Sequence, residues 1–194
     1  MRKLEDRSSS QWPEIDIDDE RFLNFCSNDY LGMSSNQRVL DRVIRELKTF
    51  GFGSAGAALL TGRCTLHSEL ETKLAAYTGH ESALLFSSGY LANLGAIGSL
   101  VGKEDWVFQD RLNHASLIDA VLMTRSRHRR YPHLEIPSSP SPIGKKSYLI
   151  TESIFSMDGD KICPTALCKY CVENNSTLYI DDAHGFGVLG EGQG

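Results

Sequence analysis

The chain has 194 residues, of which 41% are hydrophobic and 23% charged, an ordinary composition for a globular domain with a sizeable core. The net charge of −5 gives no basic footprint for nucleic acid, and no apolar run is long enough to span a membrane. The N-terminus lacks the apolar stretch of a secretory signal and the five cysteines are irregularly spaced, so we expect reduced thiols, no metal site and a cytoplasmic protein.

The N-terminal part of the chain predicts few regular elements. Residues 1–20 are polar and predict a poorly packed leader, and residues 21–26 alternate enough for a short strand. Apolar residues at helical spacing predict one helix from Asn36 to Phe50 and a second helix that Thr65 caps and Gly79 ends.

Strands and helices alternate through the rest of the chain. The expected strands are 82–86, 106–108, 129–131, 147–151 and 177–181, and the expected helices are 90–100, 116–124 and 165–174. A serine- and proline-rich stretch at 137–142 predicts a surface loop. The alternation predicts an α/β fold built from βαβ units, with a mostly parallel sheet and helices on both of its faces.

In a parallel α/β sheet, ligands bind beyond the C-terminal ends of the strands, and three polar segments fall there. The first, residues 87–90, joins a strand to a helix. The N-terminus of that helix suits a phosphate, with a plain turn as the alternative. The second contains His114 just before a helix, where the imidazole could stack on a ring, transfer a proton or simply cap the helix.

The third segment, residues 151–160, is followed later by Asp181 and His184, where the apolar run of a buried strand ends in charge. A carboxylate in such a position is costly unless it is paired with a cation, either in a structural ion pair or with a protonated heterocyclic nitrogen. A phosphate cradle, a ring-stacking residue and a buried carboxylate in this order are the parts of a pyridoxal 5′-phosphate (PLP) site.

Several segments together resemble the α-oxoamine synthase family of class-II PLP-dependent acyltransferases. These segments are residues 24–32, 52–56, 103–105, 110–117, 151–160 and 181–185. The resemblance implies the aspartate aminotransferase fold (fold type I). It further implies a strand-and-helix segment at 21–50 and a partial PLP-binding large domain at 51–194. It covers only the N-terminal half of the family, so the rest of the large domain and the small domain are expected to be absent.

The resemblance also implies roles for individual residues. Gly89 and Tyr90 would lie at the PLP phosphate, His114 would stack on the pyridine ring and orient substrate, Ser156 would contact the cofactor, Asp181 would pair with the pyridine nitrogen, and His184 would bond the ring 3′-oxygen. The family commonly has phenylalanine at the position of Tyr90. Its Schiff-base lysine lies beyond the Asp-x-x-His motif and is expected to be absent from these 194 residues.

The reaction implied is the decarboxylative condensation of L-alanine with pimeloyl-CoA or pimeloyl-acyl-carrier protein in biotin biosynthesis. Alternatives are a family member that uses glycine or serine, and a non-catalytic remnant that only binds or dimerises. A homodimer, or a complementing C-terminal half, is the expected protein partner. Because the lysine is both covalent anchor and base in the family, the chain alone is expected to be nearly inactive.

Overall fold

The computed structural model describes residues 4–138 and 145–191, and the chain divides into two compact units between Ala83 and Leu84. The sequence suggested a boundary earlier, after Phe50. None of the helices in the described part of the chain combines the length and apolarity needed to cross a membrane. Within the same residues, no group of three or more His, Cys, Asp or Glu side chains could hold a metal ion. The predicted loop at 137–142 lies mostly outside the described residues.

The first unit begins with a β-hairpin. Strands β1 (Glu14–Ile17) and β2 (Glu20–Leu23) pair antiparallel, with Ile17 opposite Glu20. The two residues between them, Asp18 and Asp19, both have positive φ, as a two-residue type I′ turn requires. The expected strand at 21–26 is therefore the second arm of a hairpin and ends at Leu23. The sequence analysis predicted no strand at β1, which lies within the polar leader, because pairing with β2 orders a segment too short and polar to predict alone.

Two helices follow in the first unit, after the short 3-10 helix η1 (Met33–Ser35). Helix α1 (Gln37–Phe50) ends as predicted and starts one residue later than predicted, because the side chain of Asn36 caps it by accepting the N–H of Arg38 at 3.0 Å. The apolar residues that predicted this helix remain 41–52% exposed; they are Val39, Val43, Ile44 and Leu47. Helical periodicity thus predicted the element but not the burial of its apolar face.

Helix α2 (Thr65–Thr78) confirms the second predicted helix with a corrected cap. The N-cap is Cys64 rather than Thr65, and its backbone N–H donates to Nδ1 of His67 at 3.2 Å. Gly79 ends the helix with a φ of 71°, a left-handed conformation that glycine adopts without steric cost.

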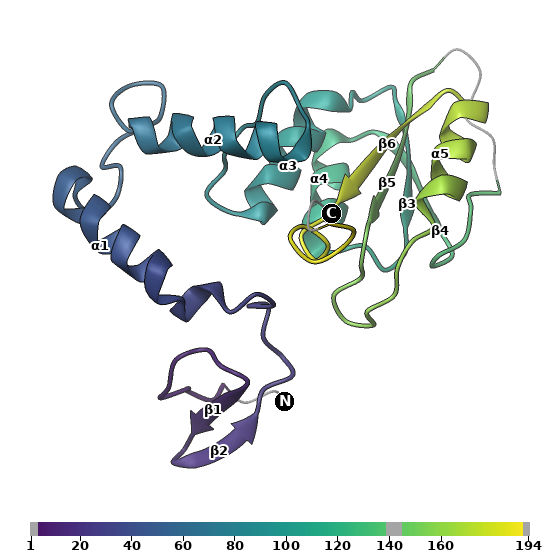
Figure 1. Ribbon diagram of the computed structural model, residues 1–194. Coiled ribbons are helices and arrows are strands. Elements are labelled where there is room, and N and C mark those ends of the chain that lie inside the picture. Colours follow the sequence, from purple (N-terminus) through teal and green to yellow (C-terminus); the bar gives the residue numbers. More distant parts are fainter. Residues whose placement is uncertain (1–3, 139–144, 192–194) are drawn as a thin grey trace. The chain divides into compact units, whose positions relative to one another are not determined.

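The second unit is a parallel four-stranded sheet with helices on both faces (Figure 1). Its strands are β3 (Trp106–Asp110), β4 (Arg127–Tyr131), β5 (Ser147–Glu152) and β6 (Ser176–Asp181), in the order β4-β3-β5-β6. Its helices are α3 (Gly89–Leu100), α4 (Ala115–Thr124) and α5 (Pro164–Glu173). The four strands are all parallel, which confirms the predicted α/β class.

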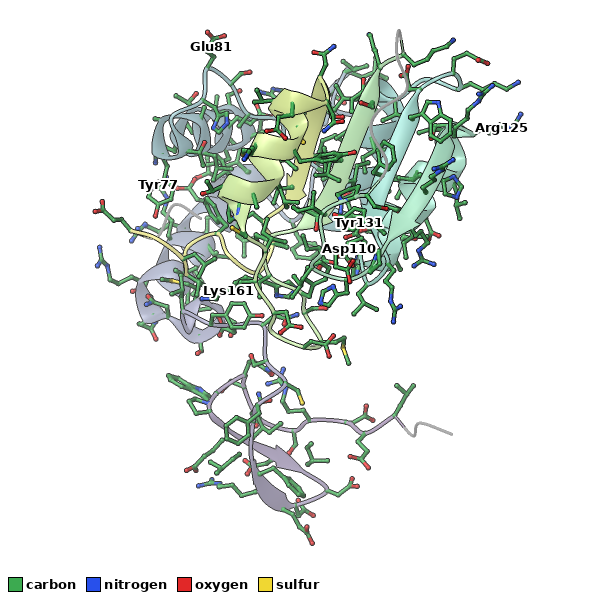
Figure 2. The ribbon with its side chains drawn as sticks, turned by 90° about the vertical axis from the view of Figure 1, so that its right-hand side faces the viewer. Tyr77, Glu81, Asp110, Arg125, Tyr131 and Lys161 are labelled. Atoms are coloured by element: carbon green, nitrogen blue, oxygen red, sulfur yellow. The ribbon has the colours of Figure 1, made fainter. Side chains whose placement is uncertain are left out.

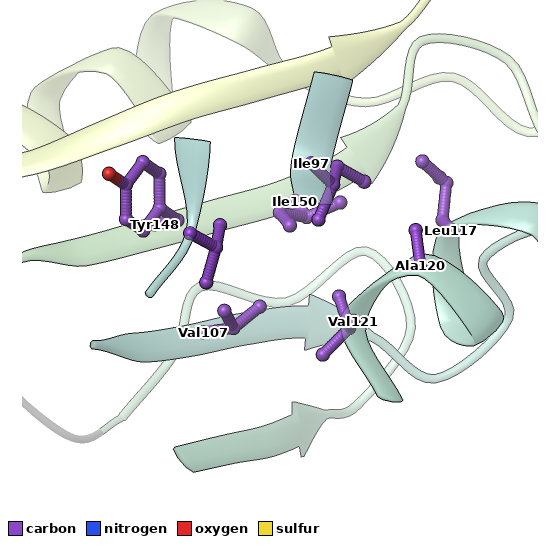
Figure 3. Close-up of a cluster of buried hydrophobic side chains, with 8 residues drawn as sticks. Ile97, Val107, Leu117, Ala120, Val121, Tyr148 and Ile150 are labelled. Atoms are coloured by element: carbon purple, nitrogen blue, oxygen red, sulfur yellow. The ribbon is translucent and has the colours of Figure 1, made fainter. Parts of the chain in front are cut away.

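Alternating side chains of the strands feed two separate hydrophobic clusters. On one face, α3 and α4 cover β3 and β5 (Figure 3), and the buried members are Ile97, Val101, Val107, Leu117, Ala120, Val121, Tyr148 and Ile150. On the other face, α5 packs over Phe108, Tyr131 and Leu149. Every residue of β5 is buried because the strand has neighbours on both sides and helices on both faces.

The prediction of a strand at 82–86 was wrong, because this segment belongs to neither sheet. Leu84 is 72% exposed, and Phe86 lies against α3, where a Cβ added to Gly95 would come within 2.7 Å of its ring. An apolar run becomes a strand only where another strand pairs with it. No described strand pairs with residues 82–86, so their β-type composition alone did not make them a strand.

Candidate cofactor site

A pocket lies at the C-terminal ends of β5 and β6, beside the first turns of α3 and α4. Five predicted site residues line it: Gly89, Tyr90, His114, Asp181 and His184. Four further residues complete the lining: Asn93, Ser116, Glu152 and Ala183. Ser156 lies elsewhere, in an exposed turn after β5. The βα topology thus gathers residues that are far apart in the sequence at one edge of the sheet, where such sheets bind ligands.

The first turn of α3 forms one wall of this pocket. Ser88 caps the helix by accepting the N–H of Leu91 at 3.2 Å, and Gly89 and Tyr90 then line the pocket. A Cβ added to Gly89 would meet no atom within 4 Å, so open space lies beside this turn. The first N–H groups of a helix have no intrahelical acceptor and carry the positive end of the dipole, which together favour an anion such as phosphate.

Tyr90 is held by a contact that phenylalanine could not make. Its hydroxyl donates a hydrogen bond to the Asp119 carboxylate on α4, and this bond raises the pKa of Tyr90. The Tyr90 ring meets the His114 ring edge to face, with centroids 6.3 Å apart. The hydroxyl therefore ties the first turn of α3 to α4 and fixes the aromatic ring beside the predicted stacking residue.

His114 caps α4 and lines the pocket at the same time. Its Nδ1 accepts the backbone N–H of Ser116 at 3.2 Å and lies 2.7 Å from the Ser116 hydroxyl. The imidazole itself is exposed. Two of the three interpretations of this residue from the sequence, helix cap and ring-contacting residue, are thus compatible, because the capping nitrogen leaves the opposite edge of the ring open.

Asp181 ends β6 with its carboxylate in the pocket. Its Oδ2 accepts from Nδ2 of Asn93 at 2.7 Å, and its Oδ1 accepts the N–H of Ala183 at 3.0 Å. No Lys or Arg is among the described residues that line the pocket. A half-buried carboxylate that is oriented by neutral donors and lacks a permanent cation fits a protonated ring nitrogen such as that of PLP.

The turn after Asp181 carries His184 into the pocket lining. Its path depends on Gly185, since a Cβ at that position would fall 2.1 Å from Oδ1 of Asp182. The same Asp182 carboxylate accepts a hydrogen bond from the Ser153 hydroxyl, which joins the turn to the end of β5. This close packing explains the glycine of the Asp-Asp-Ala-His-Gly motif and positions His184 beside Asp181.

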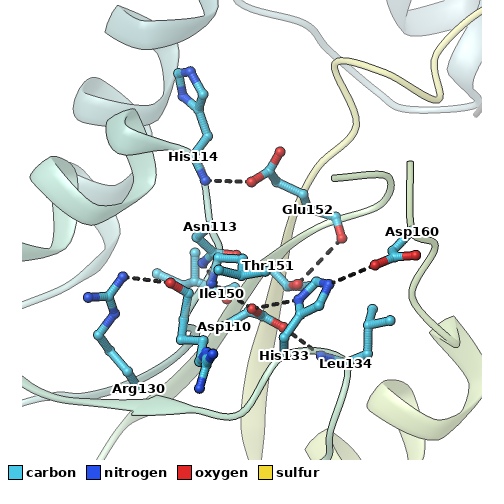
Figure 4. A network of polar contacts seen from close by, with 12 residues as sticks. Asp110, Asn113, His114, Arg130, His133, Leu134, Ile150, Thr151, Glu152 and Asp160 are labelled. Carbon is cyan, nitrogen blue, oxygen red and sulfur yellow. Dashed lines mark hydrogen bonds and ion pairs between the residues drawn. The ribbon is translucent and has the colours of Figure 1, made fainter. Parts of the chain in front are cut away.

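Glu152 is a site residue to which the sequence analysis assigned no role. It ends β5 opposite Asp181, is 4% exposed, and accepts the backbone N–H of His114 at 2.5 Å (Figure 4). Burial, reinforced by the charges of Asp181 and Asp110, raises the pKa of Glu152 to about 7. The signal in the sequence was a charged residue closing an apolar strand, the same signal that singled out Asp181.

This pKa predicts a stability that falls as the pH rises. Between its ordinary value of 4.5 and about 7, Glu152 holds its proton in the folded protein but not in the unfolded chain. Stability is therefore greatest below this window and decreases by up to about 3 kcal/mol across it. Glu152→Gln should remove that component, measured as the free energy of unfolding in urea at pH 5 and pH 8.

The matched control for this titration is Glu173→Gln on α5. Glu173 is 60% exposed and lies 3.9 Å from Lys169, an exposed pair that contributes little. The control variant should keep the pH dependence of the parent chain. If Glu152→Gln also keeps it, the buried carboxyl does not titrate in this range.

A second polar network braces the ends of β3 and β4 (Figure 4). His133 lies between two carboxylates, with Nδ1 3.0 Å from Asp110 and Nε2 3.2 Å from Asp160. Burial alone would lower the pKa of His133, but hydrogen bonds to both carboxylates outweigh it and raise the pKa. Asp110 is 1% exposed and lies beside Tyr131 at the ends of neighbouring strands (Figure 2). Asp110, the first residue of the Asp-Arg-Leu-Asn-His segment, thus has a structural role, whereas His114, its last residue, lines the pocket.

Comparison with known proteins agrees with this arrangement. A family model described as aminotransferase class I and II matches residues 20–193. The 8-amino-7-oxononanoate synthase of Nitrosomonas eutropha is 43% identical over 93% of this chain and 48% of that protein. The chain spans about half the length of the curated relatives it matches.

Two solved structures extend the comparison to three dimensions. The 8-amino-7-oxononanoate synthase of Francisella tularensis is 31% identical with a TM-score of 0.74, over 88% of this chain and 48% of that one. A structure of serine palmitoyltransferase (SPT) with PLP is 26% identical with a TM-score of 0.90, over 98% of this chain and 50% of that one. The parallel sheet and its helices are therefore those of PLP-dependent transferases.

Proposed function

Because the chain belongs to the aminotransferase class I and II family, we propose that it forms the cofactor-binding part of a PLP-dependent acyltransferase. The observation that carries the proposal is the carboxylate of Asp181, held by Asn93 and Ala183 in a pocket whose described lining includes no Lys or Arg. PLP supplies an electron sink to such enzymes when its ring nitrogen is protonated. Asp181 would keep that proton in place.

We further propose that the whole protein is an 8-amino-7-oxononanoate synthase, which condenses L-alanine with a pimeloyl thioester. The relative from Nitrosomonas eutropha supports this choice, because its 43% identity extends over nearly all of the chain. The second candidate is a condensation that uses serine, supported by the structural similarity to the serine palmitoyltransferase of Sphingomonas wittichii at 28% identity. The higher identity favours alanine. A cytoplasmic homodimer remains the expected state.

The remaining residues would divide the work of binding and positioning. The first turn of α3, with Gly89 and Tyr90, would bind the phosphate, His114 would lie against the ring and orient substrate, and His184 would hold the 3′-oxygen. A contact from Ser156 to the cofactor stays a prediction from the family resemblance, since this residue lies in a turn apart from the described pocket lining. We propose that the covalent lysine is supplied from outside these 194 residues.

Titration with PLP, followed by borohydride reduction and peptide mapping, tests the proposal. We expect the purified chain to bind PLP reversibly, as an absorbance change that dialysis removes, and reduction to label no single lysine stoichiometrically. Stoichiometric labelling of one lysine would contradict an external anchor. A complete lack of PLP binding, with the fold intact by circular dichroism, would contradict the cofactor site itself.

Complementation tests the reaction. The C-terminal half of the Nitrosomonas eutropha relative, co-expressed with this chain, should restore condensation of a pimeloyl thioester with L-alanine. Parallel assays with serine and glycine identify the amino acid. Preference for serine would move the assignment to the second candidate, and a folded, PLP-binding complex inactive with all three amino acids would favour a non-catalytic remnant.

A further inference from the structure

A buried amide joins the two sides of the cofactor pocket. Asn93 is 5% exposed and lies on α3 in an otherwise apolar stretch. Its Oδ1 accepts from the Tyr179 hydroxyl at 2.8 Å. Its Nδ2 donates to Ser116 Oγ at 2.9 Å and to Asp181 Oδ2 at 2.7 Å. One side chain therefore contacts β6 twice and α4 once, which makes it the centre of the site's polar network.

The carboxylate determines which way this amide faces. A carboxylate only accepts hydrogen bonds, so the Asn93 atom facing Asp181 has to be the nitrogen. The carbonyl oxygen then faces Tyr179, whose hydroxyl donates to it. Both N–H bonds of the amide are used, one toward Asp181 and the other toward Ser116. The flipped amide would place two acceptors against each other and leave the carboxylate without this donor.

The direction of donation continues from Asn93 to the imidazole. Ser116 Oγ accepts from Asn93, so its own proton is directed to His114 Nδ1 at 2.7 Å. The backbone N–H of Ser116 also donates to the same nitrogen at 3.2 Å. Two donors directed at Nδ1 require a lone pair there. The neutral ring of His114 therefore carries its proton on Nε2.

We propose that Asn93 is a positioning residue, which orients the carboxylate of Asp181 and fixes the tautomer of the His114 ring. The orientation of these groups does not depend on the proposed function, but its value for catalysis does. In a PLP site, the carboxylate that pairs with the ring nitrogen and the donor that contacts the ring would be oriented before the cofactor binds. With Nδ1 committed to Ser116, the Nε2–H is the hydrogen-bond donor that His114 offers to an anionic group of cofactor or substrate.

The test is 15N NMR of the imidazole in the full chain, at a pH where the ring is neutral and without cofactor. Two-bond nitrogen–proton correlations distinguish the tautomers, and we expect the Nε2–H pattern for His114. Asn93→Leu removes the donor that directs the Ser116 hydroxyl, and Ser116→Ala removes that hydroxyl itself. Only the Ser116 backbone N–H then fixes Nδ1, so both variants should show an increased fraction of the Nδ1–H tautomer. Tyr179→Phe leaves the side-chain size nearly unchanged and releases the Asn93 carbonyl, so it should shift the pattern partially.

Tyr148→Phe is the matched control for Tyr179→Phe. Tyr148 lies on the neighbouring strand β5 and donates its hydroxyl to the carbonyl of Leu100, away from the pocket. The Tyr148→Phe variant should leave the NMR correlation pattern of His114 unchanged and keep PLP affinity within about twofold of the parent chain. Asn93→Leu should weaken PLP binding about tenfold or more, since it removes a hydrogen bond to a charged group. If it does not fold, Tyr179→Phe carries the comparison.

The outcomes separate this inference from the proposed function. An Nδ1–H tautomer in the parent chain would overturn it, as would a Tyr179→Phe variant indistinguishable from Tyr148→Phe in the His114 spectrum. An Nε2–H tautomer that depends on Asn93 supports it even in a chain that fails to bind PLP, and in that case the proposed cofactor site alone is wrong.

Discussion

Asp181→Asn is expected to abolish most of the PLP affinity of this chain. Removing one partner of a buried, hydrogen-bonded charge pair costs about 2–5 kcal/mol, or a loss of roughly thirtyfold to several thousandfold in affinity. The variant has a second defect. The carboxylate accepts from both the Ala183 N–H and Asn93 Nδ2, whereas the amide has a single acceptor oxygen and can satisfy only one of them, with its own NH2 group then facing the other donor.

Asp182→Asn is the control for this loss. Asp182 is the next residue and has the same chemistry, but its carboxylate accepts from Ser153 and does not line the pocket. Its PLP affinity should remain within about threefold of the parent, by absorbance titration at constant salt. A urea titration of each variant shows whether lost binding reflects lost folding. Equal PLP affinity in Asp181→Asn and the parent would remove Asp181 from the site.

Leu117→Ala should destabilise the second unit by about 2–5 kcal/mol. Leu117 on α4 is 0% exposed and packs in the cluster between this helix and the sheet, where truncation leaves a cavity that close-packed neighbours do not fill (Figure 3). Leu122 lies on the same helix and is 52% exposed, so Leu122→Ala should change stability by no more than about 0.5 kcal/mol.

Tryptophan fluorescence can report this effect unit by unit. The chain has two tryptophans, Trp12 in the first unit and Trp106 at the start of β3. In a Trp12→Phe background, the urea transition of Trp106 follows the second unit alone. Similar transition midpoints for the Leu117 and Leu122 variants would show that α4 does not pack on the sheet as described.

Elements with strong local signals were predictable from the sequence. The helix and strand at 165–174 and 177–181 correspond closely to α5 and β6, because helical periodicity and an apolar run are both clear there. The run at 82–86 had an equally apolar composition but forms no strand, since pairing is a property of the partner. The polar strand β4 extended beyond its predicted length because β3 pairs with it along its whole length.

The residues of the pocket also divide into those that the sequence could predict and those that it could not. Asp181, His114 and Gly89 could be singled out because each interrupts a strand or starts a helix with chemistry that a core does not need. Asn93 could not, since a single polar residue on a helix has no distinctive pattern until it lies beside a carboxylate.

The sequence by itself determined the alternation of strands and helices, the parallel sheet and the carboxylate that ends β6, because these depend on composition and spacing along the chain. Only the tertiary structure decided that Glu152 and Asp181 are neighbours, that burial raises the pKa of Glu152, and that Asn93 connects Asp181 to His114. Those properties depend on distances between segments far apart in the chain, and such distances exist only after the helices have packed on the sheet.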